Sequence, residues 1–167
     1  MLRDMDSTAV LPGHVDVFVI GAGFAGLGMA IKLAEHGESD FLVVERGQDV
    51  GGTWRDNTYP GAACDVPSQL YSFSFAPNPE WSRSFSPQAE IQDYIHDLAA
   101  RSGVLDRFRF GVTFENAEWD VAEQRWQITT SAGSCTAAVL VSGAGALSDP
   151  KLPDIEGLES FAGEVFH

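Results

Sequence analysis

The residues from Gly51 to Asp65 combine glycine, aromatic and acidic side chains at spacings that a packed core does not require. The segment reads Gly-Gly-Thr-Trp-Arg-Asp-Asn-Thr-Tyr-Pro-Gly-Ala-Ala-Cys-Asp. A glycine pair lets the backbone approach a flat ligand closely, and Trp54 supplies an aromatic face beside it. Asp65 then places a carboxylate near whatever is bound. Together these features indicate a redox cofactor site.

A second glycine motif precedes this segment. Residues 21–26 read Gly-Ala-Gly-Phe-Ala-Gly and fit G-x-G-x-x-G between an apolar run and a helical pattern, the context in which this motif binds dinucleotides. Gly21 permits the tight turn, Gly23 lets backbone meet a pyrophosphate, and Gly26 allows close packing of helix and strand. Glu45 ends the next apolar run and is the acid expected to hold a ribose.

The fingerprint alone does not separate NAD from FAD, because both carry an ADP half. FAD is favoured by the position of the motif near the start of the chain, by Arg46 next to the acid, and by the Gly-Gly-x-Trp segment that follows. The apolar run 138–143 also looks like the second nucleotide-contacting strand of two-dinucleotide flavoproteins. An NAD(P)-dependent dehydrogenase is an alternative, but it leaves the segment from Gly51 to Asp65 unexplained.

The elements around the motifs follow a β-α-β pattern. Residues 15–20 and 40–45 are apolar runs typical of buried parallel strands, and residues 24–36 show one apolar helical face that Gly37 ends. Such a unit opens a doubly wound sheet with a right-handed crossover. The sequence therefore predicts an α/β fold with a Rossmann-like, mostly parallel sheet.

The rest of the chain contributes an irregular segment, a helix and a β meander. Residues 47–87 have no helical period, but their aromatic side chains favour an ordered functional segment with a short strand over 70–75. Ser86 is expected to cap a helix with Pro87 at its first position. This helix should end near Gly103.

A β-hairpin insertion is expected from residues 108–120 and 125–130, followed by an apolar strand over 135–142. The predicted organisation has three parts: a flexible N-terminal extension (1–14), an incomplete FAD-binding domain (15–147) and a linker (148–167).

Composition excludes several function classes. The 167 residues carry a formal net charge of −14, which argues against nucleic acid and against an anionic membrane surface. Backbone N–H groups still allow a phosphate-bearing cofactor. Cys64 and Cys135 have no metal-ligand spacing, so we expect no metal site and a cytoplasmic, reducing location. His96 has no visible partner in the sequence and is expected to be exposed.

With these motifs in view, the chain resembles the N-terminal part of Baeyer–Villiger-type flavin-dependent monooxygenases, relatives of the flavin-containing N- and S-oxygenating enzymes. The resemblance rests on the fingerprint 21–26, on Gly-Gly-x-Trp-x4-Tyr-Pro-Gly-x3-Asp from Gly51 to Asp65, and on Phe-x-Gly-x3-His from Phe161 to His167. In that family a second G-x-G-x-x-G for NADPH, a helical insertion and the remainder of the FAD domain follow. None of these lies within residues 1–167, so we expect the chain to be a fragment.

The resemblance implies a set of FAD contacts. Those to pyrophosphate and ribose would be Gly21, Gly23, Phe24, Ala25, Gly26, Glu45 and Arg46. Those to the flavin and, through backbone, to the adenine would be Gly52, Thr53, Trp54, Asp65, Val66, Tyr71 and Val112. Asp65 is the implied catalytic residue, because the family's acid at this position orients an arginine, which here would lie outside the chain. Cys64 and Asp65 would also approach NADP.

The resemblance further implies that NADPH reduces the flavin and that O2 adds to form a C4a-peroxyflavin, which oxygenates a ketone, an amine or a sulfide. The motifs lean towards Baeyer–Villiger oxidation of ketones, with N- or S-oxygenation as the alternative. Most of the NADPH site would lie outside this chain, so the isolated chain should be catalytically incomplete. A different alternative is a non-catalytic dinucleotide-binding module, or half of a split flavoprotein, that self-associates or binds a complementary chain through open sheet edges.

Overall fold

One six-stranded sheet of order β3-β2-β1-β6-β5-β4 organises the chain. The computed structural model describes residues 10–147 and 149–165. The strands are β1 (His14–Ile20), β2 (Phe41–Glu45), β3 (Phe108–Phe110), β4 (Phe114–Asp120), β5 (Arg125–Thr130) and β6 (Gly133–Ser142). β1 pairs in parallel with β2 and β6, and β2 with β3, whereas β4, β5 and β6 form an antiparallel meander. The predicted Rossmann-like α/β sheet with a meander insertion is confirmed.

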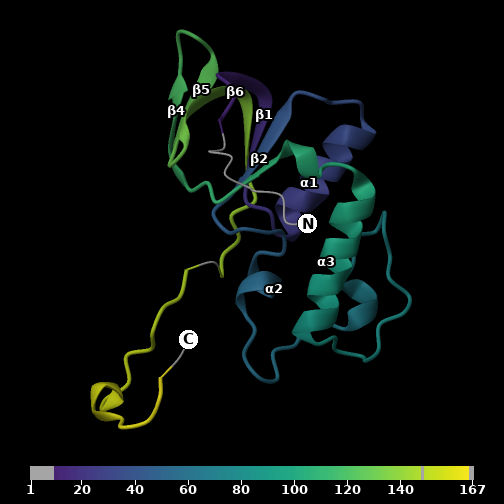
Figure 1. Cartoon of the computed structure of the whole chain (residues 1–167), viewed down its shortest axis with the longest axis vertical. Helices are drawn as coiled ribbons and strands as arrows, with labels where there is room; N and C mark the ends of the chain where they lie inside the picture. Colours follow the sequence, from purple (N-terminus) through teal and green to yellow (C-terminus); the bar gives the residue numbers. More distant parts are fainter. Residues whose placement is uncertain (1–9, 148, 166–167) are drawn as a thin grey trace, which may run out of the picture.

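The helices of the described residues are two long ones and several short ones. They are α1 (Phe24–Glu35), α2 (Thr53–Asp56), α3 (Gln88–Ser102) and the 3-10 turns Ser68–Leu70, Leu105–Arg107 and Leu158–Ser160. Figure 1 shows α1 and α3 together on one side of the sheet. The helix α3 ends, as predicted, at Gly103, which adopts a left-handed conformation with φ +71°.

Alternation along the parallel strands produces two apolar layers. Val17, Val19 and Val43 pack towards the helices, where their buried neighbours include Leu27 and Ile91. The opposite layer packs against the meander and consists of Val15, Phe18, Leu42, Val44, Val112, Ile128, Cys135 and Ala137. Because both faces of β1 and β2 are covered, their nearly continuous apolar sequence is explained.

The strand expected over 70–75 is absent from the described residues, which show instead the 3-10 turn Ser68–Leu70 and an isolated bridge between Phe73 and Ala76. The cause is the Tyr94 hydroxyl of α3. It accepts the Phe73 N–H at 3.0 Å and donates to the Ala76 carbonyl at 2.8 Å. One side chain thus satisfies backbone groups that a strand would have offered to a neighbour.

The predicted cap of α3 is also wrong. Pro87 occupies the N-cap position, and no side chain caps the helix. The hydroxyl of Ser86 lies 2.6 Å from that of Ser68, and both serines are fully buried. The Ser86 hydroxyl therefore contacts another residue of the irregular segment 64–86 instead of capping the helix.

The predicted hairpin forms between β4 and β5, with Trp119 opposite Trp126. Residues 108–110, assigned to that hairpin from the sequence, belong instead to the parallel part of the sheet, where Phe108 pairs with Val43. Gly111, with φ +70°, separates the two pieces. A left-handed glycine lets the chain leave the parallel sheet before the meander begins.

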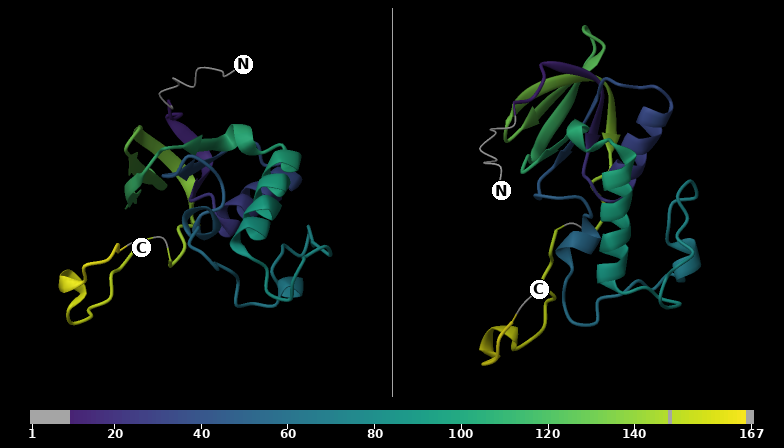
Figure 2. Two further views of the ribbon diagram at one scale, coloured as in Figure 1. Left: turned by 60° about the horizontal axis from the view of Figure 1, so that its bottom comes forward. Right: turned by 45° about the vertical axis from the view of Figure 1, so that its right-hand side comes forward.

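The segment after β6 leaves the body of the molecule (Figures 1 and 2). Its apolar side chains are largely exposed, among them Leu152, Ile155 and Phe161. His167, the last residue of the third motif, lies outside the described residues, as does most of the expected N-terminal extension. Within the described ranges, no helix is long and apolar enough to cross a membrane.

Replacing Gly26 by alanine should lower the free energy of unfolding by at least about 3 kcal/mol, because overpacking against backbone cannot be relieved by a side-chain rotation. The new Cβ would stand 1.7 Å from the Gly21 carbonyl oxygen. Gly13→Ala is the matched control, since nothing lies within 4 Å of its added Cβ, and should change stability by less than about 0.5 kcal/mol. Urea unfolding followed by circular dichroism measures both; equal stabilities would contradict the packing described.

Candidate dinucleotide site

Two glycines of the fingerprint, Gly21 and Gly26, have no room for a side chain. Gly21 has φ +91°, and a Cβ on it would come within 2.7 Å of the Gly143 carbonyl oxygen. Gly26 packs directly on the Gly21 carbonyl. The end of β6 therefore lies against the fingerprint turn, where the sequence placed a second nucleotide-contacting strand.

The N-terminus of α1 has the properties of an anion site. Its N-cap is Gly23, no side chain caps the helix, and its first turn contains no acidic residue. Helical geometry leaves the first N–H groups without intrahelical partners, and the helix dipole is positive at this end. A pyrophosphate fits these donors. Phe24 and Ala25, the predicted contacts of this turn, lie in the first turn of the helix.

The two glycine motifs meet face to face. A Cβ added to Gly52 would lie 3.1 Å from the Cα of Gly23, and the Gly51 N–H donates to the Ala22 carbonyl at 2.9 Å. Gly52 also has φ +54°, which favours glycine. The bare backbone of both motifs thus forms one continuous surface that can approach a ligand closely.

Gly51 has a different role from the one read in the sequence. It is buried, has φ +123°, and a Cβ on it would collide with Gln92 Oε1 at 2.1 Å. Gln92 Nε2 donates to the Val50 carbonyl at 3.0 Å. Gly51 therefore makes room for a side chain of α3 that fixes the loop, a role that the sequence did not indicate.

His96 extends this contact, contrary to the expectation that it has no partner. Its Nε2 lies 2.8 Å from Asp49 Oδ2 and 2.8 Å from Gln92 Nε2. The helix α3 thus holds the loop 47–52 through two side chains one helical turn apart.

Glu45, the predicted ribose acid, is almost completely buried at the carboxyl end of β2, with 6% of its surface exposed. Its Oε2 accepts the Ala22 N–H at 2.8 Å, and its Oε1 accepts the Gly47 N–H at 2.7 Å. Arg55 Nη1 lies 3.0 Å from Oε1. The carboxylate therefore connects the fingerprint turn, the following loop and α2.

Arg55 was not identified from the sequence. Burial by itself lowers the pKa of Arg55, but hydrogen bonding to Asp56 and the charges of Glu45 and Asp56 outweigh it, so that the pKa is raised and the guanidinium stays charged. Its Nε lies 2.8 Å from Asp56 Oδ1, and Nη1 donates to the Asp49 carbonyl at 2.6 Å. The sequence carried no signal for these contacts, because they depend on how α2 folds back over the loop.

Arg46, a predicted contact, is exposed and pairs with Asp149 at 2.6 Å.

An aromatic cluster borders the other end of the glycine surface. Trp54 Nε1 donates to the Tyr71 hydroxyl at 2.9 Å, and the two rings are nearly perpendicular with centroids 5.5 Å apart. Phe24 contacts Tyr71 edge to face at 5.2 Å. The amide of Gln88 also donates to the Trp54 carbonyl, another contact that the sequence did not indicate.

The remaining predicted residues divide between the two ends of the site. Burial, opposed by the hydrogen bond from Trp54, raises the pKa of Tyr71, with smaller contributions from Cys64 and Asp65. Asp65 and Val66 are exposed, and Thr53 begins α2. Val112 is buried beside Glu45, and its N–H donates to the Glu45 carbonyl at 2.9 Å.

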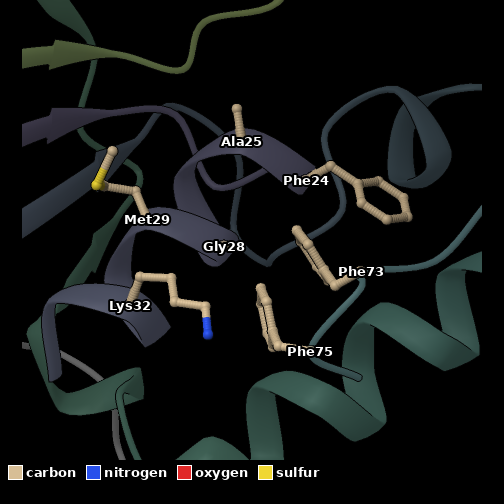
Figure 3. Close-up of a pocket in the computed structure, with 7 residues that line it drawn as sticks. All are labelled: Phe24, Ala25, Gly28, Met29, Lys32, Phe73 and Phe75. Carbon is tan, nitrogen blue, oxygen red and sulfur yellow. The ribbon is translucent and has the colours of Figure 1, made fainter. Parts of the chain in front are cut away.

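A hollow of about 500 Å³ lies on the outer face of α1 and shares Phe24 and Ala25 with the fingerprint (Figure 3). Its walls are largely apolar, and Lys32 lies over the Phe75 ring at 4.0 Å from the centroid. The hollow offers no carboxylate for a ribose and is open to solvent, so we assign the dinucleotide site to the glycine surface. The described residues contain no cluster of side chains that could hold a metal ion.

Comparison with known proteins supports this geometry. A family model described as an NAD(P)-binding Rossmann-like domain matches residues 19–87. A Baeyer–Villiger monooxygenase of Streptomyces coelicolor is 56% identical over 154 residues, which cover 92% of this chain and 30% of that protein. The chain is homologous to a part of the Baeyer–Villiger monooxygenases.

Solved structures agree with this relationship. Cyclohexanone monooxygenase from Rhodococcus sp. Phi1 bound to NADP+ superposes with a TM-score of 0.83 at 34% identity, covering 94% of this chain and 30% of that one. The OTEMO complex with FAD and NADP gives a TM-score of 0.81 at 35% identity, covering 92% of this chain and 30% of that one. The chain thus spans about 30% of the length of the Baeyer–Villiger monooxygenases that it matches.

Replacing Tyr71 by phenylalanine should lower the free energy of unfolding by about 1–2 kcal/mol, because the Trp54 indole N–H loses its acceptor in a half-buried position. Tyr59→Phe is the control, since Tyr59 is 57% exposed, and should leave stability unchanged. Denaturant unfolding monitored by tryptophan fluorescence compares the two. A loss of equal size in both variants would mean that the indole contact does not stabilise the cluster.

Proposed function

We propose that this chain is the FAD-binding portion of an NADPH- and O2-dependent monooxygenase of the Baeyer–Villiger type. One observation carries the proposal: the predicted contacts lie in a row. The row begins at Val112 and Glu45, continues through the fingerprint turn and Gly52, and ends at the aromatic cluster around Trp54. Their order matches the order of groups in an extended dinucleotide, which has adenine, ribose, pyrophosphate and a second ring system. The homologues named above, one of them in complex with FAD and NADP, support the choice of FAD.

The residues present fit such a group. The facing backbones of Gly23 and Gly52 form a cradle that a Cβ on Gly52 would crowd, and the end of α1 supplies N–H donors without competing side chains. In this proposal the helix end holds the pyrophosphate, Glu45 holds the ribose with Arg46 alongside, and the carbonyl of Val112 meets the adenine. FAD, when bound, supplies the redox chemistry that joins NADPH oxidation to the use of O2.

The protein groups at the aromatic end orient the ring system and exclude water from it. Gly52, Thr53 and Trp54 would border the flavin. The oxygen of Tyr71 accepts the indole N–H, and the hydroxyl, which is protonated at neutral pH, can itself donate. We propose that Asp65 and Val66 line the reactive side and that Asp65, with Cys64 behind it, faces NADP and an arginine from beyond this chain.

The substrate in this proposal is a small ketone, with an amine or a sulfide as the alternative of heteroatom oxygenation. NADPH would bind largely outside residues 1–167, so these residues alone should not complete the reaction. A cytoplasmic location stays a prediction from cysteine usage and composition.

The purified chain should bind FAD in a saturable way, with quenching of flavin fluorescence, because the adenosine and pyrophosphate contacts lie within the described residues. Glu45→Gln should weaken FAD binding at least about tenfold, since it removes a charged acceptor for the ribose. Glu123→Gln, in the turn between β4 and β5, is the matched control and should bind as the unmodified chain does. Absence of FAD binding by the unmodified chain would contradict the proposal for this chain, and so would NADPH-dependent oxygenation by residues 1–167 alone.

A second candidate is a non-catalytic module, or half of a split flavoprotein, completed by another chain. It is favoured by the second half of β6. Pairing with β5 ends at Ala137, whereas pairing with β1 continues to Ser142, so residues 138–142 are paired on one side within the described sheet. Val139 in this stretch is 49% exposed. An apolar strand with one unpaired edge is a template for addition of a further strand.

If this edge binds a second copy, the chain should sediment as a dimer or larger species at tens of micromolar. Val139→Lys should then shift it towards the monomer, because a lysine on an edge strand opposes pairing. Val121→Lys, in the turn after β4 where Val121 is 79% exposed, is the control and should leave the association intact. A monomeric unmodified chain would rule out self-association through β6.

A further inference from the structure

We propose that Arg55 is a positioning residue for dinucleotide binding: it fixes the Glu45 carboxylate so that Oε2 alone is presented to the adenosine ribose. This inference rests on the proposed function, because it concerns the same site. It adds to the site a residue of α2 that the sequence did not indicate.

The polar contacts of the carboxylate are divided unequally between its oxygens. Each oxygen of an ionised carboxylate has about two acceptor positions. Oε1 accepts the Gly47 N–H at 2.7 Å and forms an ion pair with Arg55 Nη1, which lies 3.0 Å away. Oε2 accepts the Ala22 N–H at 2.8 Å. Among the described residues, the guanidinium thus lies against Oε1, and Oε2 keeps an acceptor position for a ribose hydroxyl.

The ion pair of Arg55 with Glu45 is shielded from water. The side chain of Arg55 is 18% exposed and that of Glu45 is 7% exposed. Surface ion pairs fix little because solvent screens them, whereas a buried, hydrogen-bonded pair constrains both partners. Fixing Glu45 in this way reduces the freedom that a ribose would otherwise have to remove on binding.

Arg55 is itself held in place. Asp56 accepts from Nε at 2.8 Å and from Nη2 at 3.0 Å, and the Asp49 carbonyl accepts from Nη1 at 2.6 Å. The guanidinium lies over Gly47, where an added Cβ would stand 2.3 Å from Cζ. Gly47 has no left-handed φ, so its missing side chain serves the arginine and not the backbone conformation. Gly47→Ala should therefore displace the guanidinium from Glu45 without altering Arg55 itself.

The test compares ADP with 2′,3′-dideoxy-ADP, which lacks the ribose hydroxyls, by calorimetric titration of the full chain. Arg55→Gln should weaken ADP binding about tenfold, because the Glu45 carboxylate is no longer held for the ribose hydroxyl, and should leave the affinity for dideoxy-ADP unchanged. Arg55→Lys should restore part of the loss because it keeps the charge and a donor. Gly47→Ala should reduce the ADP affinity by a similar factor. In the Arg55→Gln variant it should cause no further reduction, because both changes remove the same contact.

The matched control is Arg125→Gln, which removes an arginine paired with Glu123 at 3.1 Å on the meander and should bind both nucleotides normally. Unchanged ADP affinity in Arg55→Gln would overturn the inference while leaving the proposed function intact. Equal weakening of both nucleotides would also overturn it, since that pattern indicates a general structural role. Failure of the unmodified chain to bind either nucleotide would overturn the proposed function and this inference with it.

Discussion

The buried carboxylate of Glu45 is the interaction on which the site depends. A charge removed from water is stable only when it is paired and hydrogen-bonded, and loss of a partner of such a charge costs about 3–5 kcal/mol. Here the partners come from the fingerprint turn, the loop after β2 and α2. Three segments that are separate in the sequence must therefore take up one arrangement for the charge to be satisfied.

This arrangement explains why the glycines of the chain have different roles. Gly21 and Gly26 let the turn and helix pack, and Gly52 and Gly23 bring two backbones together. Gly47 and Gly51 make room for Arg55 and Gln92, which fix the loop from α2 and α3. Polar side chains of α2 and α3 thus fix the loop on one side. On the other side, where the ribose and the flavin would bind, the loop offers backbone without side chains. Ligand sites outside the carboxyl ends of parallel strands commonly have this exposed, preorganised backbone.

The features that the sequence predicted are those encoded locally. The apolar strands, the amphipathic α3 with its glycine end and the G-x-G-x-x-G turn each depend on a short stretch with its own period or conformational need. The predictions were wrong where a side chain distant in the sequence formed a hydrogen bond that changed the local structure. The Tyr94 hydroxyl accepts the backbone N–H of Phe73 and so prevents a strand there. The Ser86 hydroxyl, which was expected to cap α3, contacts the Ser68 hydroxyl instead. Arg55 was missed for the same reason, because its partner Glu45 becomes its neighbour only after α2 folds over the loop.

The most direct test of the account is an amide ¹H–¹⁵N NMR titration of the full chain with ADP. Chemical-shift changes should gather at residues 21–26, at Glu45 with its neighbour Gly47, and at Val112, since these groups surround the proposed adenosine and pyrophosphate positions. Changes confined to the part of the hollow outside the fingerprint, at Gly28, Met29, Lys32, Phe73 and Phe75, with none at residues 21–23, Glu45 or Val112, would contradict this assignment.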